Sequence, residues 1–257
     1  MRFFKTNPVI LRQELRALIT LAVPVAVSEL GWMSMAVVDT AMVGRLNAVA
    51  IGAVGLSSIL YGAVVLFGFG LQLSMDPLIS QSYGAGDIAD CHHTLNQGIL
   101  LSVAITVPLM AIILGMPYAF THLGINAAIV SAAAPFIRVL AWSTLPLLLY
   151  ACLRRYLQAV QLVRPIMIAL LTANLLNAFA DWVLIYGHLG LPALGVVGAA
   201  WSTFVARIYL MAYLAVTLFF AERKSEHGLF STALRVDIQR LQTMLRLGLP
   251  AAFQIII

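Results

Sequence analysis

Acidic side chains stand inside long apolar stretches of this sequence. Asp39 lies within the apolar stretch 23–44, and Asp181 lies within the stretch 165–187. In the interior of a bilayer an ionised side chain costs about 3 kcal/mol or more, so such residues usually face a polar cavity and handle ions or protons. The two aspartates are therefore the first candidates for chemistry in this chain.

Two asparagines extend the pattern around Asp181. Asn174, Asn177 and Asp181 share one face of a helix, within about 60° of each other. Counted at about 1.5 Å per residue from the outer end of its own stretch, Thr203 lies in the same half of the membrane as Asp39 and Asp181. We expect an ion or proton site formed by Asp39, Asn174, Asn177, Asp181 and Thr203. Hydrogen bonding between helices is the alternative role of the asparagines.

The oxygen atoms of this set suit two kinds of ligand. Carboxylate and amide oxygens bind hard cations, so a sodium ion at Asp39, Asn177 and Asp181 is one expectation. A buried aspartate that takes up and releases a proton is the other. The choice between proton and sodium as the coupling ion stays open, and we expect no organic cofactor.

A second group of side chains lies earlier in the first apolar stretch. Trp32, Met33 and Met35 could line an aromatic, adaptable cavity for flat organic cations, and Glu29 could contact the charge of such a substrate. The alternatives are packing for the three apolar residues and a structural ion pair between Glu29 and Arg207.

The composition of the chain identifies its solvent. Apolar residues make up 62% of the sequence, charged residues make up 10%, and the mean hydropathy is +0.98. Because soluble domains carry about 25% charged residues, this is the composition of an integral membrane protein.

Six apolar runs have the roughly 20 residues that a bilayer of about 30 Å requires. They fall at 17–41, 50–75, 95–117, 128–152, 165–187 and 195–220. None alternates with a period of two, which excludes an outer-membrane barrel. We therefore predict an all-α membrane protein with a six-transmembrane-helix bundle, followed by the start of a seventh helix.

Basic residues give the expected orientation of these helices. Most of the fifteen Lys and Arg residues fall on one side of the predicted bundle, namely Arg2, Lys5, Arg12, Arg16, Arg154, Arg155, Arg164, Arg223, Lys224, Arg235, Arg240 and Arg246. Positively charged loops stay in the cytoplasm, so we expect a cytoplasmic N-terminus in a multi-pass protein of the plasma (inner) membrane, in contact with lipid. The segment 76–94 does not follow this pattern, because it lies on the same side but holds three aspartates and no Lys or Arg. Basic residues split among loops give no reason to expect nucleic-acid binding.

An internal repeat divides the chain. Residues 15–30 align with residues 241–256, matching leucines and a proline at the same spacing, and both segments follow a basic stretch. Transporters are often built from two such halves related by an axis along the membrane normal. We expect an N-terminal six-helix lobe at 1–220, a cytoplasmic linker at 221–246 and the truncated start of a second lobe at 247–257. A chance match between apolar segments is the alternative.

Motifs of common enzymes are missing from the sequence. It contains no P-loop, no H-E-x-x-H and no G-x-S-x-G pattern. We therefore expect no enzymatic activity and no catalytic residue, and an ion gradient is the expected source of energy.

Four motifs follow one another in a specific order. They are MAVVDTAMVGRLNAVAIGAVGL at 35–56, PLISQSYGAGD at 77–87, LRRYLQAVQLVRPIMIALLTANLLNAFADWVLIYG at 153–187 and LPALGVVGAAWST at 191–203. Together they resemble the N-terminal half of a multidrug and toxic compound extrusion (MATE) transporter.

This resemblance implies a twelve-helix antiporter of two six-helix lobes that exports cationic drugs in exchange for protons or sodium ions. It places the family's first-helix Asp at Asp39, its fifth-helix Asn and Asp at Asn177 and Asp181, and its sixth-helix Thr at Thr203. The second lobe, with a seventh-helix carboxylate that some members use, does not occur in this chain. The expected partners are therefore organic cations, membrane lipid and a C-terminal lobe.

Two other functions remain open. A lipid-precursor flippase of related architecture would carry a more basic cavity, because it binds phosphates, whereas the expected site here is acidic. A membrane interaction module would not transport at all. A second six-span half after Ile257 would favour the antiporter.

The orientation can be tested by labelling. Cysteines introduced at Asn126 and His188 should react with an impermeant thiol reagent added outside intact cells, and a cysteine at Ser225 should not, because the basic loops retain their side of the bundle in the cytoplasm. The opposite labelling pattern would mean that the bundle is inverted.

Overall fold

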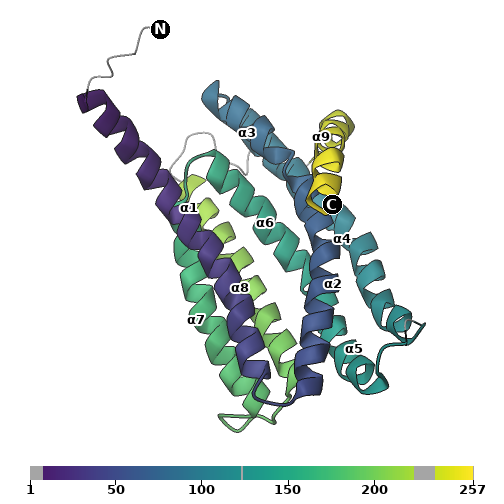
Figure 1. Ribbon diagram of the computed structural model, residues 1–257. Helices are drawn as coiled ribbons and strands as arrows, with labels where there is room; N and C mark the ends of the chain where they lie inside the picture. The colour runs from purple at the N-terminus through teal and green to yellow at the C-terminus, as the bar shows by residue number, and fades with distance from the viewer. Residues whose placement is uncertain (1–7, 123, 223–234, 257) are drawn as a thin grey trace, which may run out of the picture.

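The computed structural model describes residues 8–122, 124–222 and 235–256, and all regular structure in these ranges is helical (Figure 1). The helices are α1 (Pro8–Val43), α2 (Ala48–Gln72), α3 (Met75–Gly84), α4 (Ile88–His122), α5 (Ala127–Trp142), α6 (Thr144–Ala159), α7 (Arg164–Tyr186), α8 (Val196–Glu222) and α9 (Ile238–Ile256). The predicted all-α fold is confirmed.

Within the described residues, five helical segments are long and apolar enough to cross a membrane. They lie in α1, α2 with α3, α4, α7 and α8. The helices α5 and α6 meet the same criterion only when taken together, and they bend by 45° where they meet, so the total is six if this pair is one span. The six predicted spans are thus recovered, with the fourth, 128–152, broken into two helices.

The break between α5 and α6 has a local cause. Pro146 stands in the first turn of α6, where its missing N–H leaves the carbonyl four residues earlier without a helical partner. Ser143 lies at the joint, and its hydroxyl donates to the Leu140 carbonyl oxygen at 2.7 Å. The α5 and α6 segments can therefore point in different directions without leaving the Ser143 side chain unsatisfied.

The helices form two groups that meet along α8. On one side α1 packs along α7, and α7 packs along α8; on the other side α2 packs with α4 and α5 (Figure 1). Contacts of α8 with α5 and α6 join the two groups. Hydrogen bonds fix α1 on α7, because the Tyr186 hydroxyl donates to the Met42 carbonyl oxygen at 2.7 Å. In contrast, α1 touches α2 only sparsely, which leaves room between them.

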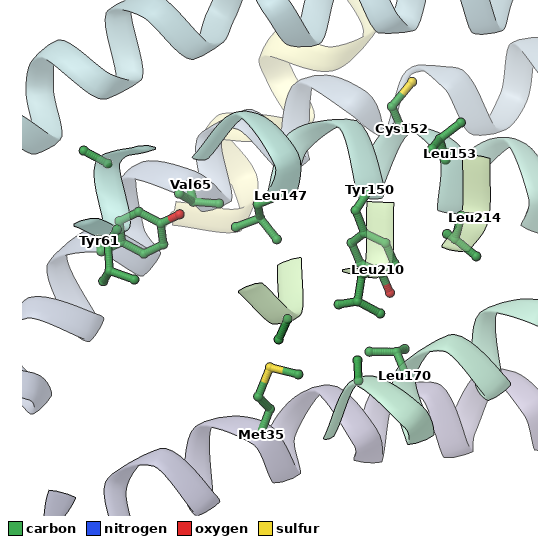
Figure 2. Packing of buried hydrophobic residues seen from close by; sticks show 14 of the residues in the cluster. Met35, Tyr61, Val65, Leu147, Tyr150, Cys152, Leu153, Leu170, Leu210 and Leu214 are labelled. Carbon is green, nitrogen blue, oxygen red and sulfur yellow. The ribbon is translucent and has the colours of Figure 1, made fainter. Parts of the chain in front are cut away.

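Apolar side chains fill the interior between these groups. Figure 2 shows Leu147 and Tyr150 of α6 directed toward the side of the bundle occupied by Met35 of α1. On the outside, large apolar side chains such as Ile59 and Leu175 are exposed. Such a surface suits hydrocarbon, which agrees with the composition of the chain.

Ion pairs gather at the end of the bundle where α3, the start of α4 and the start of α9 lie (Figure 1). They join Arg155 to Asp76 at 2.9 Å, Arg240 to Asp90, and His93 to Asp237 at 2.9 Å. A backbone hydrogen bond from Arg240, with the His93 contact, holds the pKa of Asp237 below its usual value. The acidic segment 76–94 therefore receives its counter-charges from α6 and from the start of α9.

The helix α9 docks on α2 through close backbone contact. A Cβ atom added to Gly248 would lie 2.4 Å from the Leu71 carbonyl oxygen, and one added to Gly70 would lie 2.3 Å from the Ala252 Cα. The helix begins at Ile238, so its first residues belong to the segment that was expected to be a linker, 221–246. The division of the chain into a lobe, a linker and a second lobe stays a prediction.

Docking of α9 should fail when this contact is filled. Gly248→Val places a side chain against the α2 backbone, and overpacking of this kind costs about 1–3 kcal/mol, roughly a fivefold or larger shift toward the undocked helix. Trypsin should then cleave after Arg235 and Arg240 faster in detergent solution. Gly55→Val is the matched control, because a Cβ at Gly55 meets no atom within 4 Å. Equal cleavage rates in the two variants would contradict the docking.

Candidate functional site

Three helices bring the predicted polar side chains together in the interior of the bundle. The Thr203 hydroxyl of α8 donates to Asp39 Oδ2 of α1 at 3.1 Å. The neighbouring Ser202 hydroxyl donates to Asp181 Oδ1 of α7, and it accepts from Asn177 Nδ2 at 3.5 Å. We call these five residues, Asp39, Asn177, Asp181, Ser202 and Thr203, the acidic cluster.

Adjacent residues of α8 hold the two carboxyl groups of the acidic cluster, Thr203 at Asp39 and Ser202 at Asp181. Ionised carboxylates only accept hydrogen bonds and repel each other, so a proton or another cation stabilises two of them in one site. Among the described residues, Asp39 Oδ1, Asp181 Oδ2 and Asn177 Oδ1 are buried and meet no donor. Three orphaned oxygen atoms are the ligands that a proton or a hard cation requires.

The local sequence explains this geometry. Asn177 and Asp181 are four residues apart, which places both on the α7 face that packs on α8 and buries both completely. Ser202 and Thr203 are adjacent in α8, so their hydroxyls point about 100° apart and reach different carboxyl groups. The cluster therefore depends on the rotation of α1, α7 and α8 about their own axes.

Asn174 does not join the acidic cluster. Its amide donates to the Gly31 carbonyl oxygen of α1 at 2.9 Å and to the Leu170 carbonyl oxygen at 2.8 Å. This is the hydrogen bonding between helices that was the alternative for the asparagines. Its role is to hold α7 against α1, one turn away from Asn177.

Ser202 was missed by sequence reasoning. The signal available was a second hydroxyl residue directly before Thr203. Serine in an apolar helix commonly bonds its own backbone, and Ser202 does donate to the Ala199 carbonyl oxygen at 2.9 Å. Only the approach of α7 shows that it also serves a carboxyl group.

A cavity of about 340 Å³ adjoins the acidic cluster. It lies between α1, α2, α5, α6 and α8, where α1 and α2 stand apart. Asp39 and Thr203 belong to its wall, so the cluster is open to the cavity. The remaining wall holds the aromatic rings of Trp32, Tyr61, Phe69 and Phe136 together with aliphatic side chains. Sites for drug-sized ligands measure about 300–1,000 Å³ and are lined mainly by such apolar groups.

The structure divides the four residues predicted for the substrate cavity. Trp32 and Met35 line it, and Trp32 stacks on Tyr150 with the ring centroids 6.2 Å apart. Met33 points away and is 65% exposed, because it is turned about 100° from Trp32 on the helix. Glu29 lies outside the cavity wall and pairs with Arg154 of α6. This cavity therefore includes neither Met33 nor Glu29, and a contact of these two residues with substrate stays a prediction.

The alternative for Glu29, an ion pair with Arg207, does not form either, since Glu29 pairs with Arg154. Arg207 Nη1 donates to the Tyr61 hydroxyl oxygen at 2.6 Å and to the Ser143 hydroxyl oxygen. Its guanidinium carbon lies 4.9 Å from the centroid of the Tyr61 ring. Residues of two helices meet only if both helices turn them toward each other.

Among the described residues, no group of three or more His, Cys, Asp or Glu side chains could hold a metal ion. A sodium ion at the acidic cluster would instead use the two carboxyl groups and the Asn177 oxygen. The orphaned oxygens fit that ligand set, and they fit a proton equally.

Comparison with known proteins gives one family and a consistent set of relatives. The MatE family model matches residues 24–183. A protein named probable multidrug resistance protein NorM from Mesorhizobium japonicum is 30% identical over 94% of this chain and 52% of its own length. Another protein of that name from Bradyrhizobium diazoefficiens is 31% identical over 92% of this chain and 51% of its own.

Solved structures show the same fold. The eukaryotic MATE transporter AtDTX14 superposes with a TM-score of 0.82 at 19% identity, over 95% of this chain and 53% of its own. The chain thus spans about half the length of the curated relatives and of the solved structure that it matches.

Proposed function

Since the chain belongs to the MATE family of membrane transporters, we propose that it forms the N-terminal lobe of a secondary transporter that exports organic cations in exchange for protons or sodium ions. It is a multi-pass membrane protein and not an enzyme. The curated relatives carry names of multidrug resistance proteins. The observation that carries the proposal is the acidic cluster open to an aromatic cavity.

The acidic cluster accounts for the exchange of an organic cation for a proton or a sodium ion. A proton or sodium ion bound at Asp39 and Asp181 neutralises the wall of the cavity, which weakens its attraction for an organic cation. Loss of the ion restores negative charge at Asp39, which lines the cavity, and attracts a new organic cation. One kind of cation thus displaces the other, and the two share the carboxyl groups in turn.

The other groups of the cluster position these carboxyl groups. Thr203 holds Asp39 through Oδ2, and Ser202 holds Asp181 through Oδ1. The hydroxyls leave the second oxygen of each carboxyl group for the ion. Asn177 adds an amide oxygen at the same place.

Alternating access needs a second lobe. Transporters with two such halves rock one half against the other around a site at their interface. The chain covers about half of each relative, and residues 241–256 match residues 15–30 in the spacing of leucines and a proline. We place the N-terminus and the linker in the cytoplasm and the chain in the inner membrane, with lipid around the apolar outer surface.

The cavity favours the antiporter over a lipid-precursor flippase. A flippase was expected to carry a basic cavity, whereas this wall combines one guanidinium group, that of Arg207, with the carboxyl group of Asp39. Ser202, next to Thr203 on α8, holds a second carboxyl group, that of Asp181.

The exchange can be tested by efflux. Cells would express this chain together with the C-terminal half of the Mesorhizobium japonicum relative, and ethidium efflux would be measured at matched expression. Asp39→Asn and Asp181→Asn should each reduce the rate about tenfold or more, because each removes a charged contact of about 1.5–3 kcal/mol.

Asp87→Asn is the matched control for these variants. Asp87 is exposed, and asparagine preserves its hydrogen bond to the Asp90 backbone N–H. An efflux rate equal to that of the unmodified chain in both Asp39→Asn and Asp181→Asn would contradict the proposed ion site. Absence of efflux from the unmodified pair of lobes would contradict the half-transporter itself.

A further inference from the structure

We propose that Arg207 is the anion-binding residue of the cavity, so that the cavity takes amphipathic zwitterions whose carboxylate contacts this guanidinium while their cationic group lies at Asp39. This assignment rests on the proposed function only in that the cavity binds organic molecules.

Arg207 is a buried cation that lines the cavity without an acidic partner. It is 8% exposed and belongs to the cavity wall. The ion pairs among the described residues join other cations, His93, Arg154, Arg155 and Arg240, to carboxylates. An intramembrane arginine almost always pairs or faces a functional cavity, because its charge is costly in hydrocarbon.

The protein contacts of Arg207 use one edge of the guanidinium. Within the described part of the chain, both of its hydrogen bonds leave from Nη1, toward Tyr61 and Ser143. Nε and Nη2 make no hydrogen bond there and are not fully buried, and Arg207 belongs to the cavity wall. A guanidinium presents five N–H donors in a fork that fits a carboxylate with two parallel hydrogen bonds. The free edge therefore suits a ligand carboxylate.

The distribution of charge along α8 sets the arrangement of the ligand. Arg207 lies four residues after Thr203, about 6 Å along the helix, and Thr203 holds Asp39. The cavity thus offers a carboxyl group and a guanidinium about one helical turn apart, beside the rings of Trp32 and Phe69. A flat aromatic ligand with an amine at one end and a carboxylate at the other matches this wall.

Arg207 also has a structural contact that any test must separate. Ser143 stands at the joint of α5 and α6, and the Arg207 guanidinium donates to its hydroxyl. Removing Arg207 could loosen this joint and weaken every ligand equally. A contact between Arg207 and a ligand carboxylate is shown only if the substitution changes the ratio of the Kd values of two ligands, one with the carboxylate and one without it.

Two matched dyes measure that discrimination. Rhodamine B carries a free carboxylate, and its ethyl ester carries the same cationic ring system without it. Fluorescence polarisation would give the Kd of each dye for the full chain in phosphatidylcholine nanodiscs. We expect Arg207→Gln to weaken rhodamine B about tenfold and to leave the ester unchanged or tighter, since a hydrogen-bonded charge is lost. Arg207→Lys, which retains the charge without the fork, should lie between.

Ser143→Ala separates the structural contact from the charge. It removes the hydroxyl at the joint and should leave the ratio of the two Kd values as in the unmodified chain. Equal weakening of both dyes in Arg207→Gln and Arg207→Lys, or an unchanged ratio in both, would overturn the assignment. If the unmodified chain binds the ester but every variant has the same Kd for rhodamine B, the anion-binding role of Arg207 is contradicted and the proposed function is not. If the unmodified chain binds neither dye, the proposed function is contradicted as well.

Discussion

The placement of two carboxyl groups on adjacent residues of α8 is the constraint on which the rest of this structure depends. Asp39 and Asp181 come from helices far apart in the sequence, and adjacent residues of α8, Thr203 and Ser202, hydrogen-bond to them. Two ionised carboxylates in one buried site repel each other, so a proton or a cation bound at their free oxygens stabilises the pair. A site that must hold one cation at a time is suited to exchanging one cation for another.

The surrounding architecture serves this pair in two ways. Close packing of α1, α7 and α8 fixes the carboxyl groups, through Thr203, Ser202 and the amide of Asn174 on the α1 backbone. Sparse packing between α1 and α2 leaves the cavity through which Asp39 can be reached. At the far end, ion pairs from α6 and α9 hold the acidic segment 76–94. The contacts of α1 with α7 and α8 thus hold the carboxyl groups in place, and the gap between α1 and α2 gives access to them.

Depth and helical period could be read from the sequence, because both follow from counting residues along a helix. They were enough to place Asp39, Asn177, Asp181 and Thr203 near one another, and to find the six spans. The rotation and lateral position of each helix could not be read, because packing between helices sets them. That is why an ion pair with Arg207 was one alternative for Glu29, whereas Arg154 of α6 supplies its partner. The break at Ser143 was missed for a similar reason, since proline near a span signals a kink without its direction.

Competition between cations at the acidic cluster is the most direct test of this account. The affinity of the chain in lipid for tetraphenylphosphonium, a cation that cannot titrate, would be measured by calorimetry across a range of pH and of sodium concentration. The account predicts that raising the concentration of protons or of sodium ions weakens the binding, and that Asp39→Asn abolishes this dependence. An affinity that responds to neither ion, or that responds equally in the variant, would contradict a shared site.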